Sequence, residues 1–106
     1  MADGTESAEI IYDDPECLAI TPLRVMAPTH VLVFPRAHYD GLPYFLEREV
    51  ESVGRLMRRA AEIAAQRGLN ERGYRLVWNF GPDTKQRITH PHLHLLGGTL
   101  LREELA

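Results

Sequence analysis

The sequence predicts an α+β domain: one antiparallel sheet of about five strands with a single long helix on one face. Short apolar runs separated by Pro- and Asp-rich turns flank one long segment whose apolar residues follow a helical period. The whole chain has 106 residues, which is long enough for one domain and too short for two. These observations together favour one small sheet covered by one helix.

Three short strands are expected before the helix. Residues 9–12 and 17–20 are apolar runs, and the turn Asp13-Asp14-Pro15-Glu16 separates them. Residues 30–34 form the third run, which Pro35 ends. Because the connections between these runs are short, the strands are expected to pair antiparallel as a meander.

The helix is expected from about Tyr44 to Arg67, between Pro43 and Gly68. Apolar side chains recur there at alternating spacings of four and three, the stripe of an amphipathic helix. The members of this stripe are Leu46, Val50, Val53, Met57, Ala60 and Ala64, and Leu56 and Ile63 widen it. Such a broad apolar face predicts that the helix lies on the sheet.

Two further strands are expected after the helix, at residues 74–79 and 92–96. The loop from Gly81 to Arg87 lies between them. Residues 1–8 are small, polar and acidic, and are expected to form a disordered leader before a domain that spans residues 9–106.

Composition narrows the class of protein. With 44% hydrophobic and 25% charged residues the chain resembles an ordinary globular domain, and its net charge of −3 argues against a nucleic-acid binder. Cys17 is the only cysteine, so no internal disulfide can form. No apolar stretch approaches the roughly 18 residues of a membrane span. The prediction is a cytoplasmic protein that binds neither nucleic acid nor membrane.

The most informative motif places His90, His92 and His94 at every second position. Residues at this spacing share one face of an extended strand, so the three imidazoles are expected on one side, with Leu93 and Leu95 pointing into a core on the other. Imidazole titrates near neutral pH, attacks phosphorus or carbonyl centres and binds divalent metals. This strand is therefore the expected site of chemistry.

Three interpretations of these histidines are open. They can be solvent-facing strand residues, metal ligands, or a nucleophilic centre that acts at phosphorus. A metal site would want a carboxylate or further histidines nearby, and Asp83, His30 and His38 are the candidates. Lys85 and Arg87 would repel a cation but suit an anionic phosphate. The surrounding residues therefore favour phosphorus chemistry.

The residues that surround the histidines extend this hypothesis. His30 opens the third strand and His38 follows the turn after it, so both are expected near the other three histidines. Asn79 stands at the end of the fourth strand, and the loop that follows can supply further donors to a phosphate.

The motif from His90 to Leu96, followed by Gly97-Gly98, resembles the histidine triad (HIT) motif, in which histidines alternate with apolar residues. The resemblance extends to residues 13–19, to residues 27–38 and, in the Hint-like branch of the family, to residues 68–81. It covers about residues 9–98, which is most of the chain.

The resemblance implies the HIT fold, in which a homodimer joins two sheets into one. It also implies hydrolysis or transfer at the α-phosphorus of nucleoside phosphoramidates or related nucleotide conjugates, without a metal or other cofactor. By position, His92 would be the nucleophile that forms a nucleotidyl-histidine intermediate. His90 and His94 would flank it and contact the phosphate or leaving group, His30 would support them, and Asn79 would donate to a phosphate oxygen.

The resemblance leaves the substrate open. Gln86, Arg87 and His38, together with Asn79, are the predicted substrate-binding residues. Pro22 stands where the family usually carries a ribose-binding side chain, and Arg87 where a small hydroxyl residue is common. These two departures motivate a first alternative, a nucleotide-binding protein with little or no turnover. A metal-dependent hydrolase built on the histidine strand is the second.

Overall fold

The computed structural model describes residues 9–86 and 88–102, and this part of the chain forms one five-stranded sheet with two helices. The strands are β1 (Glu9–Asp13), β2 (Cys17–Thr21), β3 (Thr29–Pro35), β4 (Tyr74–Trp78) and β5 (Leu93–Gly97). The helices are α1 (Leu42–Arg48) and α2 (Val50–Gln66), and a 3₁₀ turn follows β4 at Pro82–Thr84. The predicted leader, residues 1–8, lies outside the described residues.

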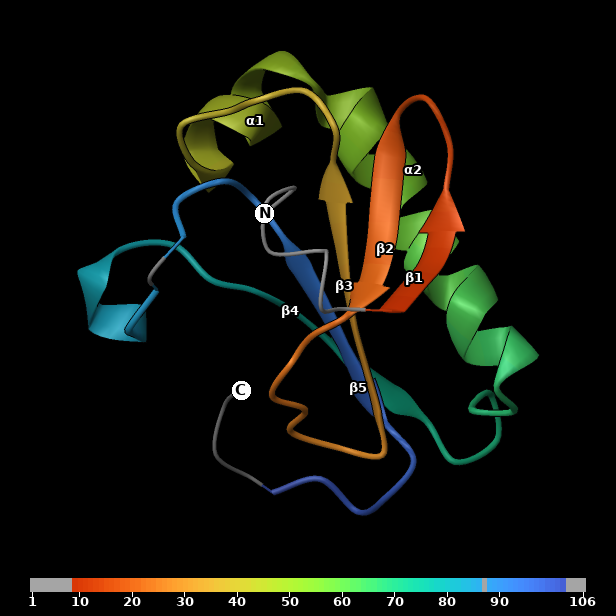
Figure 1. Ribbon diagram of the computed structural model, residues 1–106. Helices are drawn as coiled ribbons and strands as arrows, with labels where there is room; N and C mark the ends of the chain where they lie inside the picture. The colour runs from red at the N-terminus through yellow and green to blue at the C-terminus, as the bar shows by residue number, and fades with distance from the viewer. Residues whose placement is uncertain (1–8, 87, 103–106) are drawn as a thin grey trace.

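The strands lie in the order β1-β2-β3-β5-β4, and each neighbouring pair is antiparallel (Figure 1). The first three strands form the expected meander, and β5 then enters the sheet between β3 and β4. The predicted α+β class and antiparallel five-stranded sheet are thereby confirmed. Among the described residues, no helix is both long enough and apolar enough to cross a membrane.

The two faces of the sheet carry different residues. Val31 and Val33 of β3 pack with Leu93 and Leu95 of β5 in the main core, which α2 covers (Figure 1). A smaller cluster lies on the opposite face and consists of Leu18, Ile20, Leu32 and Phe34. Because strand side chains alternate between faces, His94 points away from α2, toward the second face.

The predicted single helix is in fact two, because the backbone leaves the helical region at Glu49, with φ −132° and ψ 46°. The hydrogen bonds continue through the bend, since the Glu49 N–H donates to the Phe45 oxygen (2.8 Å) and the Val53 N–H donates to the Glu49 oxygen (3.0 Å). The sequence has neither Gly nor Pro at this point, so no local signal predicts the bend. Phe45 is fully buried against Tyr39.

The predicted stripe is also partly wrong. Leu46, Val50 and Met57 are 43%, 67% and 38% exposed, whereas Leu56 and Ile63 are buried at its centre. The buried face of α2 comprises Ser52, Val53, Leu56, Ala60, Ile63 and Ala64. Val53, Ala60 and Ala64 of the predicted stripe are therefore correct, whereas Leu46 lies in α1, before the bend.

The corrected stripe can be tested by comparing Leu56→Ala with Met57→Ala. Leu56 is completely buried, so its truncation should leave a cavity and lower the free energy of unfolding by about 3 kcal/mol. Truncation of the more exposed Met57 should cost less than about 1 kcal/mol. Urea unfolding followed by the fluorescence of Trp78 measures both; equal losses would contradict the assigned face.

Candidate active site

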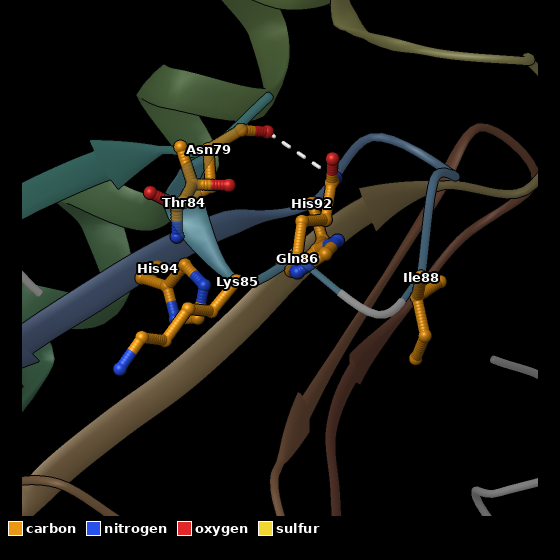
Figure 2. Close-up of a pocket in the computed structure, with 7 residues that line it drawn as sticks. All are labelled: Asn79, Thr84, Lys85, Gln86, Ile88, His92 and His94. Atoms are coloured by element: carbon orange, nitrogen blue, oxygen red, sulfur yellow. Dashed lines mark hydrogen bonds between the residues drawn. The ribbon is translucent and has the colours of Figure 1, made fainter. Parts of the chain in front are cut away.

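A pocket of about 210 Å³ lies where the end of β4, the following loop and the start of β5 meet (Figure 2). Its lining residues are Asn79, Thr84, Lys85, Gln86, Ile88, His92 and His94. This volume is enough to hold a phosphoryl group. It brings together two of the three motif histidines with the predicted residues Asn79 and Gln86.

His92 has a defined tautomer. Its Nδ1 lies 2.8 Å from the carbonyl oxygen of His90. Since a carbonyl oxygen can only accept, Nδ1 must carry the proton and donate it. The other ring nitrogen, Nε2, therefore keeps its lone pair, and the ring lines the pocket. A backbone carbonyl thus prepares His92 to act as a nucleophile.

His94 belongs to a chain of hydrogen bonds that begins at the backbone. The Met26 N–H donates to His30 Nδ1 (3.0 Å), so the proton of a neutral His30 must sit on Nε2. That nitrogen lies 3.0 Å from His94 Nδ1, which therefore accepts. The remaining proton of His94 is on its Nε2. His94 is thus a hydrogen-bond donor in the pocket where His92 offers a lone pair.

Burial keeps these supporting histidines neutral. It lowers the pKa of His30, and burial together with the neighbouring His92 and His30 lowers the pKa of His94 to about 4. The His30 side chain is only 3% exposed. At neutral pH the pair therefore carries no charge, which is the state that the hydrogen-bond chain requires.

The His90 ring has contacts that differ from those expected, and it does not line the pocket. β5 begins at Leu93, so of the three histidines only His94 lies within a strand, and Pro91 just before it has no N–H to pair. His90 Nε2 donates to the Pro35 oxygen (2.7 Å), and Nδ1 accepts from the Tyr39 N–H (3.4 Å). Both ring nitrogens of His90 are thus occupied and burial lowers its pKa, so His90 acts on the pocket through its carbonyl oxygen, which accepts from His92.

His38 lies outside this pocket, although it was predicted to bind substrate. Its ring stacks on His90 at 5.9 Å between centroids, and its Nε2 lies 3.0 Å from an Asp40 carboxylate oxygen. The side chain is 78% exposed. The structure thus places His38 beside His90, one step away from the pocket histidines.

The loop after β4 is closed by a single side chain. The Gln86 amide oxygen accepts from the Gly81 N–H (3.1 Å), and the Gln86 amide nitrogen donates to the Asn79 carbonyl (3.3 Å; Figure 2). Gln86 therefore shapes the pocket wall as well as lining it. The predicted contribution of Arg87 lies outside the described residues.

Sequence reasoning missed Thr84 and Ile88, whereas Lys85, which the sequence associates with an anionic phosphate, does line the pocket. They reach the pocket because the 3₁₀ turn and the Gln86 bridge fold the loop back over the histidines. The sequence signal that could have found them is the short connection between Asn79 and His92, because a short connection keeps its residues close to both of its ends.

Comparison with known proteins agrees with this geometry. A family model described as the HIT domain matches residues 4–100. A HIT family hydrolase from Legionella pneumophila Philadelphia 1 has a similar structure, with a TM-score of 0.88, 35% identity, and coverage of 97% of this chain and 92% of that chain. The chain belongs to the HIT family.

Two relatives match the sequence at 42% identity. A HIT-like protein of Synechococcus elongatus matches over 94 residues, which is 89% of this chain and 82% of the relative. A 14 kDa zinc-binding protein of Zea mays matches over 91 residues, which is 84% of this chain and 70% of the relative.

The name of the maize relative raises the question of whether the present residues fit a metal. Within residues 9–86 and 88–102, no three or more His, Cys, Asp and Glu side chains are grouped so that they could hold one. Both ring nitrogens of His30 and of His90 already have partners. The described side chains therefore do not fit a metal centre.

The partly buried His94 should make stability depend on pH. Its pKa is about 4 in the folded chain and near 6.5 when unfolded, so on acidification the unfolded state takes up the proton first. The contribution of neutral His94 to the free energy of unfolding should be fully present above pH 6.5 and should be lost as the pH falls to about 4. With allowance for partial exposure of the ring, the loss is on the order of 2 kcal/mol.

This loss can be measured by urea unfolding at pH 7 and pH 4.5. His94→Asn keeps a short polar side chain beside His30 but does not titrate, so its stability should change less with pH than that of the original protein. An equal change in both proteins would show that His94 is not the group responsible.

Proposed function

We propose that this protein hydrolyses or transfers nucleotidyl groups by attack of His92 on the α-phosphorus of a nucleoside phosphoramidate or related nucleotide conjugate. One observation carries the proposal: the carbonyl of His90 holds the proton on His92 Nδ1, so a lone pair on Nε2 is available in a phosphate-sized pocket. The name of the Legionella relative, a HIT family hydrolase, supports the same class of reaction.

In the first step, His92 Nε2 forms a bond to phosphorus while the bond to the leaving group breaks, and the leaving group departs with the electron pair. An amine leaving group needs a proton, which the protonated substrate nitrogen or solvent supplies. His92 becomes a nucleotidyl-imidazolium, and its Nδ1–H donates more strongly to the His90 carbonyl as positive charge develops. His94 Nε2–H donates to a phosphoryl oxygen and stabilises the charge there.

In the second step, a water oxygen attacks the same phosphorus. The bond from phosphorus to Nε2 breaks, the electron pair returns to His92, and the water proton leaves to solvent. A nucleoside monophosphate is released and His92 is restored to its starting tautomer. If another nucleophile replaces the water, the same intermediate gives transfer instead of hydrolysis.

The intermediate provides the direct test. Mixing the protein with an adenosine phosphoramidate and quenching without acid should give a mass increase of one nucleotidyl group, located on His92 by peptide analysis. His92→Ala should lose both the adduct and at least about 10³-fold of kcat/KM, because it removes the nucleophile.

His38→Gln is the matched control, since it removes an exposed imidazole outside the pocket. It should form the adduct and keep activity within about threefold of the original. An adduct that survives in His92→Ala would overturn the assignment of the nucleophile. Nucleotide binding without adduct or turnover would favour the alternative of a nucleotide-binding protein with little or no turnover. Pro22 and Arg87 are the two departures from the family pattern that motivate this alternative.

We further propose that the protein is a homodimer whose two sheets join along β4. The sheet has two edges, β1 and β4, and all five residues of β4 are only partly buried. An edge strand presents unpaired backbone groups, which a second copy can satisfy by continuing the sheet.

Sedimentation equilibrium tests this assembly. The expected mass is twice the 12.1 kDa of one chain, independent of salt because backbone pairing and apolar contact hold the interface. A single 12.1 kDa species at micromolar concentration would refute the dimer.

A further inference from the structure

We propose that the strap, which is the connection between β2 and β3 at residues 22–28, controls whether His94 presents a proton or a lone pair to the pocket. The backbone N–H of Met26 is the group through which the strap acts, so Met26 is a positioning residue and not a catalytic one. His94 donates to a phosphoryl oxygen in the proposed function, on which this inference rests. The strap does not line the pocket, yet the donation by His94 depends on it.

The strap is attached to the rest of the chain at few points. Its one hydrogen bond among the described residues runs from the Met26 N–H to His30 Nδ1 (3.0 Å). The side chains of Leu23, Val25 and Met26 are more than half exposed, and within the strap only Ala27 is buried. The position of the Met26 N–H therefore depends on the path of the strap backbone, and not on packing of the Met26 side chain.

The last residue of the strap lies against the end of β5. A Cβ placed on Gly98 would stand 3.0 Å from the Cβ of Pro28, so the glycine allows the strap to approach the strand that carries His94. Gly98 also has φ 91°, a conformation that glycine adopts without steric cost. The two segments lie side by side in Figure 1. The strap is thus anchored at Pro28, close to the Met26 N–H.

The pair of His30 and His94 has two neutral arrangements that both keep the hydrogen bond between the rings. In the observed arrangement, His30 Nε2–H donates to His94 Nδ1, and the second proton lies on His94 Nε2. In the reversed arrangement, His94 Nδ1–H donates to His30 Nε2, the second proton lies on His30 Nδ1, and His94 Nε2 holds a lone pair. The number of protons is the same, so only their positions distinguish the two.

The Met26 N–H selects the observed arrangement. Because an amide nitrogen can only donate, the reversed arrangement would direct two protons at one another, and the buried N–H of His30 would have no acceptor. A strap that moves away from His30 removes this selection. The lone pair of a reversed His94 would then oppose the lone pairs of a phosphoryl oxygen, so the proposed donation would be lost.

Replacement of one backbone group tests this role. Full-length protein made by chemical synthesis with the α-hydroxy analogue of methionine at position 26 has an ester oxygen instead of the Met26 N–H and an unchanged side chain. In ¹⁵N spectra of the histidine rings, the ratio of reversed to observed His94 should rise about tenfold or more, the effect of one lost hydrogen bond. Formation of the His92 adduct should slow by the fraction of protein that loses the donor form of His94.

Two controls isolate the amide from other effects. The same ester replacement at Val25, whose N–H has no hydrogen-bond partner among the described residues, should leave the His94 tautomer unchanged. Met26→Leu changes the exposed side chain but keeps the N–H, so it should also behave as the original protein does. In the unmodified protein, a scalar coupling across the hydrogen bond should join the Met26 nitrogen to His30 Nδ1.

An unchanged His94 tautomer in the Met26 ester would overturn the proposal. Absence of the coupling in the unmodified protein, or an equal response to the Val25 ester, would overturn it as well, because the Met26 N–H would then not be the controlling group. These spectra require neither substrate nor turnover. A tautomer shift in the Met26 ester, together with no His92 adduct in the original protein, would therefore refute the proposed reaction while sustaining the control of His94 by the strap.

Discussion

The pairing of β3 with β5 at the middle of the sheet is the constraint on which the rest depends. It sets Val33 opposite Leu93 and Leu32 opposite His94, so apolar residues enter the α2 core while the histidines face the other side. It also brings His30 within 3.0 Å of His94. A slip of one residue would place imidazoles in the core and leucines in the pocket. The free-energy cost of burying the polar rings therefore disfavours the slipped register relative to the observed one.

Backbone groups determine where the protons of the site reside. A carbonyl accepts from His92, a second carbonyl accepts from His90, and an amide donates to His30. Because an amide can only donate and a carbonyl can only accept, these contacts set the tautomers without any carboxylate. Burial reinforces the arrangement by disfavouring charged imidazole. The tautomers and ring orientations are thus consequences of strand pairing and turn geometry.

The sequence was sufficient for the fold class and the five strands, because period-two and turn signals are local. The bend at Glu49 was not foreseeable, since packing around Phe45 rather than a Gly or Pro accompanies it. Nor was the role of His90, because alternation along the chain does not reveal that Pro35 and Tyr39 lie beside its ring. Contacts between distant segments, which the sequence pattern cannot report, made these differences.

The site divides its tasks between two kinds of structure. The paired strands hold His94 and His30 in a hydrogen-bonded arrangement, and the segment just before β5 holds His92, whereas the loop after β4 contributes the facing wall of the pocket. Nucleophile geometry is therefore insulated from loop composition, because no described hydrogen bond joins the loop side chains to the imidazoles. Substitutions in this loop can therefore alter the pocket wall without disturbing the tautomer of His92.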